Sequence, residues 1–101
     1  MTMIPVHPGE ALRLEMSARG LSANALALAL HVPSGRITDI LHGKRSITTE
    51  TALRLGRYLE TGPELWVNLQ SAYNLATTES EIGERIAHEV HPPAMASSPA
   101  L

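Results

Sequence analysis

The chain has 101 residues, which is enough for one domain with a modest core and too few for two. It contains no cysteine, which excludes disulfide bonds, cysteine zinc sites and a thiol nucleophile. No apolar run approaches the roughly 20 residues of a membrane-spanning helix, and the first ten residues lack the basic start of a signal peptide. We therefore expect a soluble, cytoplasmic protein that does not enter a membrane.

Charge is distributed unevenly along the chain. Residues 1–46 carry five basic and three acidic side chains, a net charge of +2, whereas residues 47–101 carry three basic and seven acidic side chains, a net charge of −4. The overall charge of −2 is unlike the basic excess of most nucleic-acid binders. A basic N-terminal half and an acidic C-terminal half nevertheless suit a protein that approaches phosphates in one orientation. Ordinary scatter of charges in a small domain is the alternative.

The composition favours helices, because alanine and leucine dominate and the only aromatic residues are Tyr58, Trp66 and Tyr73. The first predicted helix covers about residues 8–19, with Gly20 at its C-cap. The second begins after Ser22, a good N-cap, and stops at the sequence His31-Val32-Pro33. Its alternation of alanine and leucine has the period of a strand, but alanine is a poor strand former, so a helix is predicted.

Three or four further elements complete the predicted chain. A third helix covers residues 34–41, a loop follows through residue 47, and Thr48 or Thr49 caps a fourth helix that ends at Leu59. A fifth helix starts at Gly62-Pro63, and a weaker sixth has isoleucine or valine at every fourth residue, at positions 82, 86 and 90. Residues 92–101 hold too much proline and too little apolar surface to fold, so a disordered tail is predicted. The sequence thus predicts one compact, all-α domain of five to six helices over residues 1–91.

The second and third helices have about eight residues each, too few to be stable alone. Two short helices joined by a tight turn are typical of DNA-binding proteins, in which one helix crosses the DNA backbone and the other lies in the major groove. The positions expected to be buried are apolar: Leu26, Ala27, Leu30, Val32, Ile37 and Ile40. The outward positions of the third helix hold no large hydrophobic residue: Ser34, Gly35, Arg36, Thr38, Asp39 and His42. This pattern predicts a helix-turn-helix motif.

Residues 21–59 resemble the helix-turn-helix of phage repressors and Cro, the Xre type. The matched features are Ser22, Leu26-Ala27, Val32, Ile37, Ile40, Gly43-Lys44-Arg45, Ile47 and the helix that contains Ala52 and Leu55. The flanking segments HPGEAL, residues 7–12, and GPELWVNLQSAYNL, residues 62–75, are similar to HigA-type antitoxins of bacterial toxin–antitoxin operons, also called VapI-like.

The resemblance implies a lambda-repressor-like fold and a function in two parts. Antitoxins of this type are small homodimers that bind double-stranded DNA at a palindromic operator of their own operon. They also neutralise a RelE-like toxin that cleaves messenger RNA on the ribosome. An acidic C-terminal half would complement a toxin that must be basic to bind RNA.

The same resemblance assigns base reading to the third helix. The residues that would face the base edges are Ser34, Gly35, Arg36, Thr38 and Asp39. Arg36 is the best candidate for a two-pronged contact to guanine, because its guanidinium matches the two acceptors of that base. Ser34 and Thr38 would contact a base or a phosphate. Gly35 departs from the family, where a long polar side chain is common. For Asp39 we favour an ion pair with Arg36 over a contact to cytosine.

Two further groups of residues complete the expected interfaces. Phosphate contacts are expected from exposed polar residues around the third helix, namely Ser22, Asn24, His42, Lys44, Arg45 and Ser46. Lys44 and Arg45 would also suit an ordinary solvated loop, but their place beside the recognition helix favours phosphate contact. The dimer interface is expected on the fifth helix, at Leu65, Trp66, Leu69 and Tyr73. The alternative is that Trp66 fills the monomer core.

No pattern in the chain supports an enzyme or a metal site. His88 and His91 lack the HExxH spacing of zinc hydrolases, and the serines and glycines form neither a nucleophile elbow nor a phosphate-binding loop. We expect no cofactor and no catalytic residue. Two alternatives to the antitoxin remain open at this point: a stand-alone transcriptional repressor of the same fold without a toxin, and a protein-interaction module that has lost DNA binding.

Overall fold

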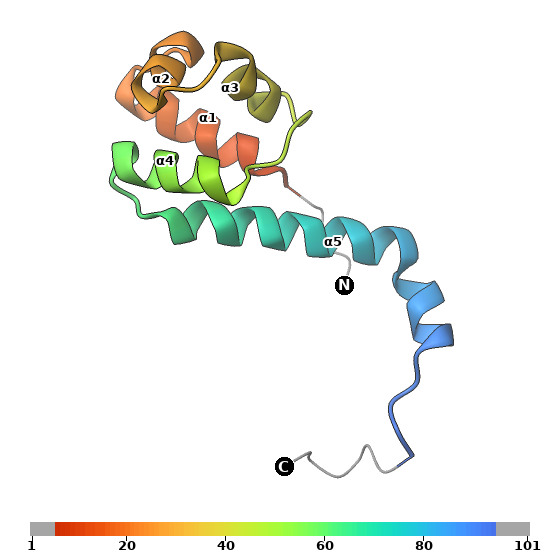
Figure 1. Cartoon of the computed structure of the whole chain (residues 1–101). Helices are drawn as coiled ribbons and strands as arrows, with labels where there is room; N and C mark the ends of the chain where they lie inside the picture. The colour runs from red at the N-terminus through yellow and green to blue at the C-terminus, as the bar shows by residue number, and fades with distance from the viewer. Residues whose placement is uncertain (1–5, 95–101) are drawn as a thin grey trace.

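The computed structural model describes residues 6–94, which form five α-helices and, over that range, no strand (Figure 1). The helices are α1 (Pro8–Arg19), α2 (Ala23–Leu30), α3 (Ser34–Leu41), α4 (Thr49–Leu59) and α5 (Pro63–Glu89). The predicted all-α class is confirmed. The predicted disordered tail lies outside the described residues from residue 95 onward, and residues 92–94 are exposed.

The predicted sixth helix is not a separate element. It continues the fifth, and together they form the 27 residues of α5. The segment between the two predicted helices, residues 77–81, is polar but contains neither proline nor glycine, so no residue there stops a helix. Low apolar content made this segment look like a boundary, whereas polar residues on an exposed helix need no burial.

Helix ends follow the capping residues of the sequence. The hydroxyls of Ser22 and Thr48 accept hydrogen bonds from the backbone N–H of Ala25 and Thr51, at 3.1 and 3.2 Å. These bonds satisfy N–H groups that have no partner inside the helix. α1 ends at Gly20, whose φ of 66° lies in the left-handed region that glycine adopts readily.

α1 to α4 pack around one apolar core, and the N-terminal half of α5 closes it. The buried hydrophobic residues are Leu12, Met16, Leu26, Ala27, Leu30, Ile37, Ile40, Ile47, Ala52, Leu55, Leu59 and Trp66. Trp66 is the largest of them and has no exposed surface. Its indole N–H donates to the Thr61 hydroxyl at 2.8 Å, so the polar group of the ring is satisfied as well.

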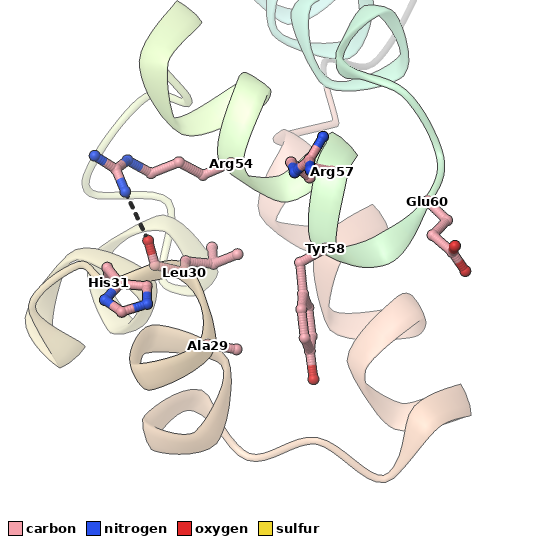
Figure 2. Close-up of a pocket in the computed structure, with 7 residues that line it drawn as sticks. All are labelled: Ala29, Leu30, His31, Arg54, Arg57, Tyr58 and Glu60. Atoms are coloured by element: carbon pink, nitrogen blue, oxygen red, sulfur yellow. Dashed lines mark hydrogen bonds between the residues drawn. The ribbon is translucent and has the colours of Figure 1, made fainter.

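Three arginines fasten the ends of neighbouring helices. Their guanidinium groups donate to the backbone carbonyl of the last residue of a helix: Arg54 to Leu30 of α2, Arg13 to Leu41 of α3 and Arg19 to Leu59 of α4, at 2.8–2.9 Å. The last carbonyls of a helix have no partner within it, and the negative end of the helix dipole favours a cation there. Figure 2 shows the bond from Arg54 to Leu30, which holds α2 against α4.

The C-terminal part of α5 leaves the body of the molecule (Figure 1). Its first half packs on α4 and α1, whereas beyond residue 77 only Ile82 and Gly83 are less than exposed. The described chain is accordingly elongated, with extents of 55 × 28 × 22 Å. Among residues 6–94, no helix is both long and apolar enough to cross a membrane.

Candidate nucleic-acid interface

α2 and α3 form the predicted helix pair, joined by the turn at residues 31–33. The turn is closed by a hydrogen bond from the Val32 N–H to the Ala27 carbonyl, at 3.0 Å. Both helices are eight residues long and are held by burial: Leu26, Ala27 and Leu30 of α2, and Ile37 and Ile40 of α3, are buried as expected. Neither helix would be stable alone, so it is the packing of these residues that fixes the orientation of α3.

The residues expected to read bases lie along α3. Ser34 and Gly35 are exposed at its start, and Arg36, Thr38 and Asp39 are half-buried. The Thr38 hydroxyl donates to the Ser34 carbonyl one turn earlier, at 3.2 Å, so its oxygen remains free to accept. A side chain at Gly35 would meet open space, so packing within the chain does not require a glycine there.

The expected ion pair between Asp39 and Arg36 is not formed. The ion pairs within residues 6–94 join Arg19 to Glu15, Arg54 to Glu50 and Arg85 to Glu89, all with i,i+4 spacing. Both side chains are in contact with water, so an ion pair between them would contribute little free energy against the entropy lost in holding the two side chains together. Arg36 is therefore unpaired in the described part of the chain.

The residues expected to contact phosphates surround α3 and are all exposed. Ser22 and Asn24 lie at the N-terminus of α2, while His42, Lys44, Arg45 and Ser46 lie in the loop after α3. The Ser22 oxygen accepts from the backbone of α2, which leaves its hydroxyl proton available to donate outward. Neither Lys44 nor Arg45 has a carboxylate within ion-pair distance among residues 6–94. This edge of the molecule thus presents three free cationic side chains, counting Arg36.

Gln70 is a buried residue that holds the loop of this surface in place, and it was not identified from the sequence. It is 5% exposed, accepts from the Ile47 backbone N–H at 2.8 Å through Oε1, and donates to Asn74 through Nε2 at 3.0 Å. The bond to Ile47 fixes the end of the α3–α4 loop on α5. A signal was present, because Gln70 follows Trp66 by four residues and so continues the buried stripe of α5.

His7 is a second support that the sequence did not reveal. Its Nδ1 accepts from the Gly9 N–H at 3.0 Å and so caps α1. Its ring packs edge-on against Tyr73 of α5, with 4.9 Å between centroids. Gly43, in the loop after α3, faces the same ring. His7 therefore ties the start of α1 to α5, close to this loop.

The predicted dimer surface is wrong for Trp66. Because Trp66 is fully buried within one chain, its side chain has no area left to bury against a second copy. Leu69 and Tyr73 are half-buried, against the core and against His7. Leu65 is exposed, at 42%. Most of the apolar residues predicted for the dimer interface thus lie on the side of α5 that packs against the other helices of the same chain.

A pocket of about 450 Å³ lies between the C-terminal ends of α2 and α4 (Figure 2). Its lining combines apolar, basic and acidic groups: Ala29, Leu30, His31, Arg54, Arg57, Tyr58 and Glu60. Arg54 is already occupied by Leu30 and Glu50. Over the range that the structure describes, no three His, Asp or Glu side chains gather where they could hold a metal ion, and this includes the segment around His88.

Comparison with known proteins gives a consistent assignment. A family model described as a helix-turn-helix domain matches residues 9–68. The structure is similar to an addiction module antidote protein of the HigA family from Coxiella burnetii, with 47% identity, a TM-score of 0.85 and coverage of 89% of this chain and 99% of that one. It is also similar to the antitoxin HigA of Pseudomonas aeruginosa, solved with the higBA promoter, with 44% identity, a TM-score of 0.86 and the same coverage.

A curated relative, Virulence-associated protein I of Dichelobacter nodosus, is 49% identical over 80 residues, which are 78% of this chain and 74% of that protein. Relatives of this similarity share more than the helix pair, since the matches include the flanking helices. The chain therefore belongs to the helix-turn-helix family, and within it to the HigA-type antitoxins.

Proposed function

We propose that this chain binds an operator of its own toxin–antitoxin operon and represses it, with α3 in the major groove. The observation that carries the proposal is the unpaired Arg36 on the outer side of α3, flanked by the exposed loop cations Lys44 and Arg45. The similar antitoxin HigA of Pseudomonas aeruginosa was solved with the higBA promoter, which supports DNA binding by this fold. Residues 1–91 act as a single domain in this proposal.

Each group has a distinct role. Arg36 donates two hydrogen bonds to the major-groove edge of guanine, and Ser34 and Thr38 contact neighbouring bases or phosphates. Asp39, whose carboxylate the phosphates would repel, accepts from the amino group of a cytosine. Gly35 lets the backbone of α3 approach the DNA closely, which a longer side chain would prevent. Ser22, Asn24, His42, Lys44, Arg45 and Ser46 set the register by binding the phosphates on either side.

Replacing Arg36 with alanine tests the base-reading role. The change is expected to weaken binding to the natural operator by about 1–3 kcal/mol, the value of one good bidentate contact, and to leave binding to random duplex nearly unchanged. The measurement is a pair of titrations, one with the promoter fragment and one with scrambled DNA. Thermal unfolding is the control for the fold. Wild-type operator affinity in a folded R36A protein would show that α3 does not read the DNA.

Replacing Lys44 or Arg45 with alanine tests the phosphate role. Each change should weaken binding to operator and random duplex alike, and each should lower the slope of log affinity against log salt by roughly one phosphate contact. Titrations at four salt concentrations give that slope. A loss confined to the operator would instead place these side chains at bases.

We also infer that the chain acts as a homodimer, because one helix-turn-helix covers too few base pairs for useful specificity. The surface available for pairing is the outer side of α5. Leu65, Ala72 and Leu75 are all exposed there, with Leu75 at 69%, and their spacing of seven and three residues puts them on one side of the helix. Leu69 and Tyr73 would contribute at the edge.

The second part of the proposed function is neutralisation of a RelE-like toxin. Support comes from the family to which the chain belongs and from the charge of its C-terminal half, which would complement a basic, RNA-binding enzyme. The first test is whether a small basic reading frame adjoins the gene and whether its product forms a complex with this chain. Absence of both would leave a stand-alone repressor.

A further inference from the structure

The last three turns of α5 lie free of the body of the molecule. We define residues 78–90 as the α5 end. Beyond residue 77, every residue of α5 is exposed except Ile82 and Gly83, which are half-exposed. At 1.5 Å per residue the segment extends for about 18 Å. Figure 1 shows it reaching beyond α1 to α4.

The α5 end carries an apolar stripe on an acidic helix. Ile82 and Ile86 lie four residues apart on the helix, and Val90, the C-cap residue directly after Glu89, continues this spacing. Ile86 and Val90 are 42% and 66% exposed. Four glutamates and one arginine give the segment a net charge of −3. The arginine, Arg85, is paired with Glu89 at 3.8 Å. Glu79 lies on the same side as the stripe, three residues before Ile82.

A helical segment of this length gains little stability by itself, and its apolar stripe offers a side that can be buried against a partner. A second copy of the chain is a poor occupant, since two segments of charge −3 would lie side by side. The proposed dimer also leaves the segment free. A two-fold axis level with Gln70 places Leu65 of one copy opposite Leu75 of the other, and residues beyond 77 then extend past the start of the partner helix.

We propose that the α5 end is the helix with which this chain docks on the toxin. Ile82, Ile86 and Val90 enter an apolar groove on the toxin, which is a basic protein. The proposal rests on the toxin-neutralising part of the proposed function. A toxin that holds messenger RNA carries cations around its substrate site, and the glutamates of the α5 end complement them. An amphipathic helix in a groove is a common mode of recognition. The site lies at the C-terminal end of α5, whereas the loop after α3 is fixed in the first third of this helix, at Gln70.

The test compares matched variants of the full chain for binding to the purified product of the small basic reading frame beside its gene. Changing Ile82 and Ile86 together to serine removes the stripe, while serine and isoleucine have similar helix propensities. We expect binding to weaken by about tenfold or more. The control changes Leu14 and Leu53, leucines on α1 and α4 that are 72% and 57% exposed, to serine and should bind as wild type. Glu79→Lys should weaken binding at low salt, and Glu64→Lys, at the other end of α5, should not.

Light scattering and operator titration of the same variants separate the outcomes. Wild-type mass and operator affinity, together with loss of toxin binding, support the proposal. Unchanged toxin binding by the Ile82→Ser, Ile86→Ser protein overturns it and leaves the antitoxin function standing. If the same variant loses the dimer but still binds the toxin, the proposal is also overturned, and the stripe is then the contact with a second copy of the chain. A wild-type chain that does not bind the toxin rejects the antitoxin function and this proposal together.

Discussion

Replacing Trp66 with alanine is expected to lower the free energy of unfolding by about 3–5 kcal/mol, a large part of the stability of a domain this size. The indole is fully buried where α5 closes the core, so its loss leaves a cavity in the apolar core. It also leaves the Thr61 hydroxyl without the donor that it has at 2.8 Å. Urea unfolding followed by circular dichroism measures the change.

Two comparisons make this result specific. Trp66→Phe keeps most of the ring volume and loses the hydrogen bond, so we expect a smaller loss of about 1–2 kcal/mol. Tyr58→Ala removes an exposed aromatic residue from α4 and should have little effect. If Trp66→Ala cost no more than Tyr58→Ala, or if its cost depended on protein concentration, Trp66 would lie at an interface between chains instead of inside one.

Helix positions were predictable because local residues determine them. Ser22 and Thr48 are N-caps, Gly20 is a C-cap, and Pro63 starts α5, each where its side chain or backbone favours that role. The boundary inside α5 was predicted wrongly because burial was used as the signal for a helix. The exposed polar residues 77–81 continue the helix through their own propensity.

The two sides of α5 show what periodicity cannot decide. Trp66 and Gln70 share one side, which faces the core, while Leu65, Ala72 and Leu75 share another, which is exposed. Both stripes have helical spacing, so either would fit a core or an interface. Only the packing of the other four helices shows which stripe is already covered.

The supports of the candidate interface depended on long-range contacts. Arg54 bonds a carbonyl 24 residues away, Arg19 one 40 residues away, and Gln70 an N–H 23 residues away. No local pattern encodes such partners, because an arginine that bonds a distant carbonyl looks the same in the sequence as one that does not. The helix pair itself was predictable, since its buried apolar residues recur at helical spacing in α2 and α3 and the exposed positions of α3 hold no large hydrophobic residue.

Changing Leu65 and Leu75 together to glutamate is expected to convert the dimer into a folded monomer. On the proposed two-fold axis the two leucines face each other across the interface, so the double change places four carboxylates in an apolar contact. Both side chains are well exposed in the single chain, at 42% and 69%, so the fold should survive. Light scattering measures the mass and circular dichroism the helix content.

The effect on DNA should be larger than that of any single base contact. A palindromic operator is bound by two linked modules, and uncoupling them removes an effective-concentration advantage of about 10²–10⁴. Operator affinity should therefore fall by about 100-fold or more, while affinity for random duplex should fall much less. The matched control changes Leu14 and Leu53 to glutamate, which adds the same charge at exposed leucines away from α5. This control should remain dimeric and bind the operator like wild type, apart from the small repulsion that both variants share. A double variant that keeps the mass of a dimer would place the interface elsewhere, and the outer side of α5 would then be free for another partner.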